Sequence, residues 1–226
     1  MSRKHVMIFG SGGDFAPAAG GGLPELTGTP TAVTWASGAD PAGQSITIPS
    51  DATAVYMFWA YYVNPDGHGL LSATLNSASP DELFEVPTGA ADAPAVGVTA
   101  WYNPSTGSQT LDVAWDTAPV EGSTCIVAYV KGGSTTAWRD ADGQVGDGTA
   151  ALSVTLTTAT DDLVLKMDMR FGTPPSTSAG WTSSQTHANN GEGAKLSYIV
   201  ATGSTQVCNS EDESWSGLCA ISIPPA

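Results

Sequence analysis

The aspartate-rich run at residues 140–147 is the part of the sequence best suited to hold a metal ion. In Asp140-Ala-Asp142-Gly-Gln-Val-Gly-Asp147, carboxylates supply the hard oxygen ligands that Ca²⁺ takes. An EF-hand loop that began at Asp140 would need Glu at its twelfth position, and that residue is Ala151. The spacing therefore predicts an acidic turn. Asp140, Asp142 and Asp147 remain a calcium candidate without the full motif, and we assign neither a metal site nor a cofactor.

Residue types for nucleophilic catalysis are present, but their spacing matches no known catalytic motif. The three histidines are His5, His68 and His187, and each falls in a terminal, turn or polar-loop context. The sequence contains no GxSxG, HExxH or P-loop pattern. We therefore predict no catalytic residue and no enzymatic activity. A polysaccharide hydrolase stays open only because paired carboxylates about 5–10 Å apart are invisible in a sequence.

The three cysteines predict neither a disulfide framework nor a zinc site. Their number is odd, and no two of them form a CxxC pair. Cys208 and Cys219 could face each other across residues 209–218, which leaves one disulfide as an alternative. Buried free thiols are the simpler expectation for Cys125, Cys208 and Cys219.

Three tryptophans lie in polar surroundings and are candidates for ligand contact. Trp138 and Trp181 each fall in a long polar stretch, and Trp215 follows the acidic run at 209–214. Exposed indole faces stack on sugars and cations. These residues could bind a glycan or a partner. The alternative is that each one packs against the body as a plug.

Charge and composition restrict the class of partner. Seven Lys and Arg against 22 Asp and Glu give a net charge of −15. A nucleic-acid site needs Lys and Arg to displace counterions, and an anionic membrane surface also attracts basic residues, so we expect neither partner. No apolar run approaches the 18 residues of a membrane span, so no membrane insertion is expected.

The hydrophobic pattern predicts an all-β chain. Residues 53–63 are almost continuously apolar, which indicates a central strand buried on both faces. Residues 95–103 and 108–116, joined by Asn103-Pro-Ser-Thr-Gly107, are predicted to form a hairpin. Residues 131–149 and 172–193 are predicted as long polar loops. The favoured fold is an antiparallel, jelly-roll-like β-sandwich with strands near 31–37, 44–48, 53–63, 70–75, 82–86, 95–103, 108–116, 123–131, 151–156, 161–171, 196–202 and 217–223.

The first thirty residues differ from the rest of the chain. Gly and Pro dominate residues 10–24, and no periodicity appears there. We predict an extended docking arm at 1–30 and a sandwich domain at 31–226. The apolar core at 6–9 is too short for a secretory signal, so we expect synthesis in the cytoplasm. The predicted partner-binding residues of the arm are Val6, Met7, Ile8, Phe9 and Phe15.

The order of the central segments resembles a β-sandwich domain of bacteriophage virion proteins. The resemblance covers about residues 45–223 and rests on Val98-Thr-Ala-Trp-Tyr-Asn-Pro-Ser-Thr-Gly-Ser-Gln-Thr-Leu-Asp-Val-Ala-Trp115, followed by Ile126-Val-Ala-Tyr-Val-Lys-Gly-Gly-Ser-Thr-Thr and Ser153-Val-Thr-Leu. Residues 132–147 are longer and more acidic than that pattern, which leaves their role open.

The resemblance implies a structural protein of the virion, displayed on the particle surface as a capsid decoration or head fibre. Its partners would be the major capsid protein or other virion proteins, and copies of itself, a trimer being one arrangement. The resemblance supplies no catalytic residues. An alternative is a receptor- or carbohydrate-binding module of a tail fibre or spike, with a host surface glycan as its ligand.

Overall fold

A computed structural model describes residues 5–8, 22–35, 43–62, 69–87, 94–116, 123–147, 150–189, 192–210 and 215–226. Within these ranges the chain is all β and every paired strand is antiparallel. The predicted antiparallel sandwich is confirmed. No described segment forms a helix that could span a membrane.

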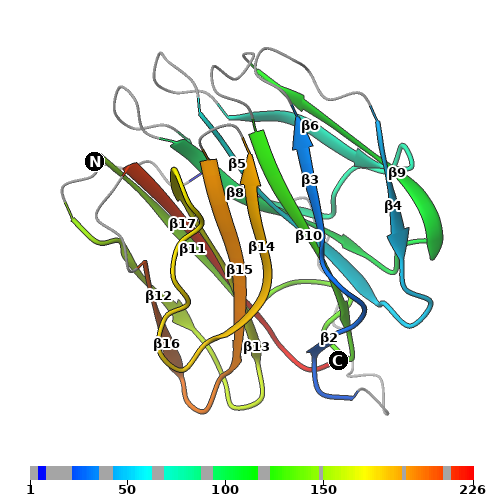
Figure 1. The fold of residues 1–226 in the computed structure, drawn as a ribbon. Helices are drawn as coiled ribbons and strands as arrows, with labels where there is room; N and C mark the ends of the chain where they lie inside the picture. Colours follow the sequence, from blue (N-terminus) through cyan, green and yellow to red (C-terminus); the bar gives the residue numbers. More distant parts are fainter. Residues whose placement is uncertain are drawn as a thin grey trace.

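Two large sheets form the centre of the molecule (Figure 1). The seven-stranded sheet contains β1 (His5–Ile8), β7 (Glu82–Val86), β8 (Pro94–Tyr102), β5 (Ala54–Tyr62), β10 (Ser123–Lys131) and β2 (Glu25–Leu26) in that order, with β3 (Thr31–Trp35) also paired to β10. The five-stranded sheet contains β11 (Asp140–Asp147), β17 (Trp215–Ile223), β13 (Leu163–Phe171), β15 (Glu192–Val200) and β14 (Thr182–Asn189).

Two small sheets cover the outer faces of this pair. A three-stranded sheet of β4 (Gln44–Ile48), β9 (Gly107–Trp115) and β6 (Leu70–Leu75) packs on the seven-stranded sheet. A two-stranded sheet of β12 (Ser153–Thr157) and β16 (Thr205–Asn209) packs on the five-stranded sheet. The sandwich therefore has four layers and three apolar interfaces, where the sequence predicted a simpler jelly-roll-like pair.

Strand β5 shows why its sequence is almost entirely apolar. Side chains alternate across a strand. Val55 and Met57 face the three-stranded sheet, whereas Tyr56 and Phe58 face the five-stranded sheet. All four are fully buried, as the sequence predicted for a central strand.

Every segment predicted as a strand contains one. The prediction of two long polar loops, at residues 131–149 and 172–193, was wrong because each of them contains a strand. Residues 140–147 form β11, which pairs with β17 along its whole length, and residues 182–189 form β14, which pairs with β15. Both are outer strands of the five-stranded sheet. The described side chains of both strands are half-buried or exposed, so neither strand needs an alternating apolar pattern.

The predicted hairpin between residues 95–103 and 108–116 is also wrong. Strand β8 pairs with β5 and β7 in the seven-stranded sheet, whereas β9 pairs with β4 and β6 in the three-stranded sheet. The Asn-Pro-Ser-Thr segment reverses the chain direction, as its turn residues indicate, but carries it from one sheet to the other. The connection from β6 to β7 crosses between the same two sheets.

The N-terminal segment contributes backbone to the seven-stranded sheet at two places. Residues 5–8 pair with β7, with Val6 opposite Phe84, and Glu25–Leu26 pair with β10. Residues 9–21 lie outside the described residues. The predicted division at residue 30 therefore places β2, which is part of the sheet, in the arm.

Candidate functional site

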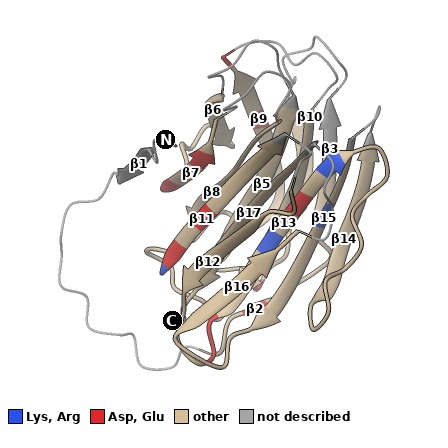
Figure 2. Ribbon diagram, turned by 90° about the vertical axis from the view of Figure 1, so that its left-hand side faces the viewer, with Lys and Arg blue, Asp and Glu red and all other residues tan. Residues whose placement is uncertain are grey.

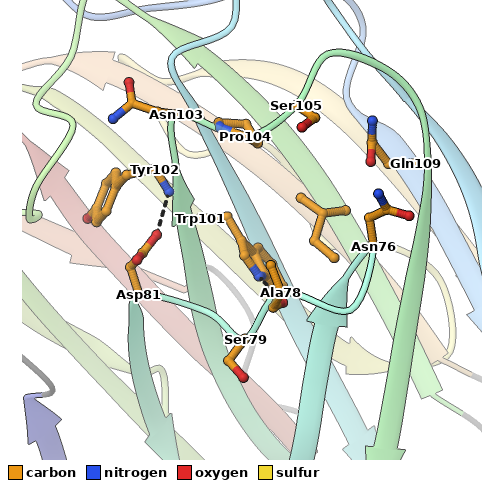
Figure 3. A pocket seen from close by; sticks show the side chains of 11 residues that line it. Asn76, Ala78, Ser79, Asp81, Trp101, Tyr102, Asn103, Pro104, Ser105 and Gln109 are labelled. Atoms are coloured by element: carbon orange, nitrogen blue, oxygen red, sulfur yellow. Dashed lines mark hydrogen bonds between the residues drawn. The ribbon is translucent and has the colours of Figure 1, made fainter.

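A polar pocket of about 280 Å³ opens where the chain crosses twice between the seven-stranded and three-stranded sheets. Two connections form its walls, β6 to β7 on one side and β8 to β9 on the other. Strand β9 adds one buried polar residue, Gln109. Figure 3 shows Trp101 at the centre of this site, with Asn76, Gln109, Ser105 and Asn103 standing around it.

The wall from β6 to β7 begins with a tight two-residue turn. Leu75 and Ala78 exchange both backbone hydrogen bonds, each with an N···O distance of 2.9 Å. The residues between them, Asn76 and Ser77, have φ angles of 50° and 69°. Two successive left-handed residues closing a hairpin are the signature of a type I′ turn. The turn fixes the backbone of Asn76 at the mouth of the pocket.

The wall from β8 to β9 is held in a similar way. Asn103 has a φ of 49°, and its N–H donates to the carbonyl oxygen of Thr53 at 2.8 Å. Asn tolerates the left-handed region better than most residues do. Pro104 follows directly and fixes its own φ. Both walls therefore present an asparagine from a conformationally restricted backbone.

Hydrogen bonds join the two walls and keep the pocket open. The indole Nε1 of Trp101 donates to the carbonyl oxygen of Ala78 at 3.0 Å. The backbone N–H of Tyr102 donates to Oδ2 of Asp81 at 2.7 Å. The N–H of Asp81 donates back to the Ala100 carbonyl at 2.8 Å. Only 3% of Trp101 is exposed, so it serves as the floor.

Behind this wall lies a half-buried acid, Glu82, that does not line the pocket. Glu82 accepts hydrogen bonds from the Tyr102 hydroxyl and from the backbone N–H of Trp138. Burial raises the pKa of Glu82 above its usual range, although the two hydrogen bonds oppose that shift. Burial also raises the pKa of Tyr102, so its hydroxyl stays protonated. The arrangement holds Tyr102 in place and offers no activated nucleophile.

The structure places two of the three predicted ligand-binding tryptophans, Trp138 and Trp181, against different cores. Trp138 is half-buried and packs against the core between the two large sheets. Trp181 is half-buried against the core below the two-stranded sheet, and its ring covers Lys166. The backbone of Trp215 begins β17, and its side chain lies outside the described residues. The arm side chains Val6, Met7, Ile8, Phe9 and Phe15 also lie outside them.

The calcium candidate lies on a strand, where its side chains bond to nearby backbone. Asp140 accepts hydrogen bonds from the N–H groups of Ala141 and Thr157, and Asp142 accepts one from Gly143. The side chain of Asp147 lies outside the described residues. Over the described ranges, no three His, Cys, Asp or Glu side chains are grouped so that they could hold a metal ion.

All three cysteines are buried free thiols. Cys208 faces the core under the two-stranded sheet, and Cys219 faces the core between the large sheets. The five-stranded sheet separates them, so the alternative disulfide is wrong. Burial raises the pKa of Cys208 to about 12 and also raises that of Cys219. Neither is a reactive thiolate at neutral pH.

The pocket residues were missed because nothing in the sequence marks them as a group. Gln109 is polar, yet it is only 8% exposed and lies on the same face of β9 as Leu111. Its Nε2 donates to the carbonyl oxygen of Thr106 at 3.2 Å, which explains how a polar residue is tolerated there. The turn residues at 76–77 and 103–104 were the only available signal. Comparison of the chain with known protein families, curated proteins and solved structures gives no match.

Proposed function

We propose that this chain is a non-catalytic structural module displayed on the outer surface of a bacteriophage particle. It acts as a capsid decoration or head fibre and attaches through its N-terminal segment. The resemblance of residues 45–223 to virion β-sandwich domains supports this function. The four-layered body, with three closed apolar interfaces, suits a durable displayed domain.

The main support for attachment through the N-terminal segment is the pairing of residues 5–8 with the edge of β7. Four residues of the N-terminal segment extend the seven-stranded sheet through backbone pairing. Adding a strand to a sheet edge is a general way to bind an extended peptide, because the backbone supplies the affinity. The same segment can extend an edge strand of a neighbouring virion protein when the particle assembles.

The acidic surface is consistent with dense display. A net charge of −15 on 226 residues makes neighbouring copies repel one another outside their specific contact. Attachment then has to come from a local, directional interaction rather than from general adhesion. The apolar run at 6–9, next to Arg3 and Lys4, is the part of the sequence whose character differs most from the acidic body.

Deletion of residues 2–21 tests the attachment. This deletion removes β1 but keeps β2, whose residues Glu25 and Leu26 pair with β10. We expect the truncated chain to unfold at nearly the same temperature as the full chain. We also expect mass spectrometry of purified particles to detect the full chain when it is expressed and not to detect the truncated chain expressed in its place.

A matched control removes apolar surface from the body instead. Leu71 is 66% exposed on β6, and Leu71→Ser is expected to leave incorporation unchanged. Normal incorporation of the truncated chain would refute attachment through the arm. Absence of the full chain from particles would refute the virion function as a whole.

A further inference from the structure

We propose that the pocket between the β6–β7 and β8–β9 connections binds one neutral sugar unit of a glycan. This inference goes beyond the proposed particle function, because the pocket lies on the sandwich body and not on the N-terminal segment. It also differs from the glycan alternative drawn from the sequence, which placed the ligand at Trp138, Trp181 and Trp215.

The first argument is the supply of hydrogen-bonding groups. The side chains of Asn76, Ser79, Asn103 and Ser105 line the pocket and make no hydrogen bond to other described residues. Amides and hydroxyls each combine donor and acceptor capacity. A sugar hydroxyl has the same dual character, so this lining matches a polyhydroxylated ligand better than an apolar one.

The second argument is charge. None of the residues lining the pocket is Lys or Arg, and Asp81 carries the one carboxylate in the lining. Its Oδ2 is committed to the N–H of Tyr102. An anionic ligand such as a sialic acid or a phosphate would face a carboxylate without any cation to offset it. The lining therefore disfavours an anionic sugar and is compatible with a neutral one.

The third argument is rigidity. The type I′ turn at 76–77 and the left-handed Asn103 fix both amide-bearing backbones before any ligand arrives. The hydrogen bond from Trp101 to Ala78 ties the floor to one wall. A preorganised site loses little conformational entropy when it binds. Weakly binding ligands such as single sugars need that advantage.

The fourth argument is size. Pockets for drug-sized ligands typically occupy about 300–1,000 Å³. At about 280 Å³ this pocket lies just below that range and suits a single ring. Because the rest of a glycan would extend into solvent from the open mouth, the pocket fits a terminal or branching sugar unit.

Solution NMR on the full-length protein tests the proposal. The probes are the methyl glycosides of glucose, galactose, mannose and N-acetylglucosamine, with methyl sialoside as the charged comparison. We expect at least one neutral glycoside to shift the Trp101 indole N–H signal and the side-chain amide signals of Asn76 and Asn103 in a saturable way. The sialoside should shift none of them.

The double variant Asn76→Gly/Asn103→Gly tests the amides. Both residues have positive φ angles, which glycine adopts without strain, so the backbone of each wall is retained. We expect the affinity for the glycoside that binds the parent protein to fall at least tenfold. Asp161→Gly is the matched control, since Asp161 has a φ of 73° and lies in the remote β12–β13 connection. That variant should bind normally.

Three results would overturn the proposal. The first is that no neutral glycoside shifts the pocket signals of the parent protein, a result that does not depend on any variant folding. The second is unchanged binding by the double variant. The third is equal binding of the sialoside. Particle incorporation is a separate measurement, so failure here leaves the attachment hypothesis standing.

Discussion

The ammonium group of Lys166 lies 3.0 Å from Oδ2 of Asp168, with both side chains buried inside the sandwich. The two residues stand two apart on β13, so they share the face that packs under the two-stranded sheet. In Figure 2, β13 carries basic and acidic positions close together along one strand. Nζ also donates to Oγ of Ser178 at 2.7 Å and to the Asn209 carbonyl at 2.6 Å. All three ammonium donors therefore have partners.

Trp181 completes this buried site. Its ring centroid lies 4.9 Å from Nζ of Lys166, within the range of a cation–π contact. The polar stretch around Trp181 thus supplies a cover for a buried charge. This explains a tryptophan in polar sequence without any external ligand.

Lys166→Met is expected to destabilise the protein strongly. The substitution leaves the Asp168 carboxylate buried without its cation, which typically costs about 3–5 kcal/mol. Urea denaturation at pH 7 measures the change in the free energy of unfolding. The double variant Lys166→Met/Asp168→Leu removes both charges and is expected to be more stable than Lys166→Met alone. A double variant at least as unstable as the single one would show that the two charges are not coupled.

Asp162 is expected to make stability depend on acid pH. Burial alone would raise its pKa, but hydrogen bonds from Arg139, Ser222 and the N–H of Ala159 outweigh burial and hold the pKa below its ordinary 3.8. A lowered folded-state pKa gives stability that is complete above the unfolded-state pKa and is lost as the pH falls through the folded-state value.

The measurement compares the parent protein with Asp162→Asn. We expect the variant to be less stable at pH 7, and the difference between the two free energies of unfolding to shrink as the pH falls below about 4. Urea titrations between about pH 7 and pH 2.5 give this difference directly. The contributions of the other carboxyl groups to the free energy of unfolding are the same in both proteins and cancel in the difference. A difference that stays constant over this range would contradict the assigned role of Asp162.

The sequence predicted the strands with an apolar face well, and it missed the polar strands β11 and β14 at the two edges of the five-stranded sheet. Strands with an apolar face leave a period-two pattern: Leu163 and Leu165 on β13 share one core face, as do Cys219 and Ile221 on β17. Strand β14 is almost wholly polar, and β11 contributes only Ala141 and Val145 to a core. Their pairing depends on the neighbouring backbone, which no local pattern records.

The turn residues revealed where the chain reverses but not which sheet it enters next. Asn103 and Pro104 mark a reversal, and a hairpin is its commonest outcome. Here β8 is already paired on both sides, by β5 and β7, so β9 has to join another sheet. The pocket arises from that change of sheet. The residue pattern of a single connection therefore cannot reveal it.

Gly97→Ala is expected to destabilise the body by overpacking. A Cβ added at Gly97 would lie 2.6 Å from the carbonyl oxygen of Phe84 and would collide with the Trp59 ring. Neither group can move freely, because both belong to strands of the same sheet. Overpacking of this kind costs about 1–3 kcal/mol, and each kcal/mol corresponds to about 2–4 °C in Tm for a protein of this size.

Gly203→Ala is the control for this substitution. A Cβ at Gly203 meets no atom within 4 Å, so the variant is expected to unfold within about 0.5 kcal/mol of the parent protein. Thermal unfolding followed by circular dichroism compares the two. Equal melting temperatures for Gly97→Ala and the parent would mean that β8 lies farther from Trp59 than the structure places it.

Ser77→Gly is expected to stabilise the turn at the pocket mouth. Ser77 has a φ of 69°, and a left-handed conformation costs an L-residue about 1–2 kcal/mol. Glycine avoids that cost but loses about 0.5–1 kcal/mol in chain entropy, which leaves a net gain between about 0 and 1.5 kcal/mol. Asn-Gly is also the preferred pair for a type I′ turn. Ser77→Val, with a β-branched side chain, should lower Tm instead, and a fall in Tm for Ser77→Gly would contradict the left-handed geometry of the turn.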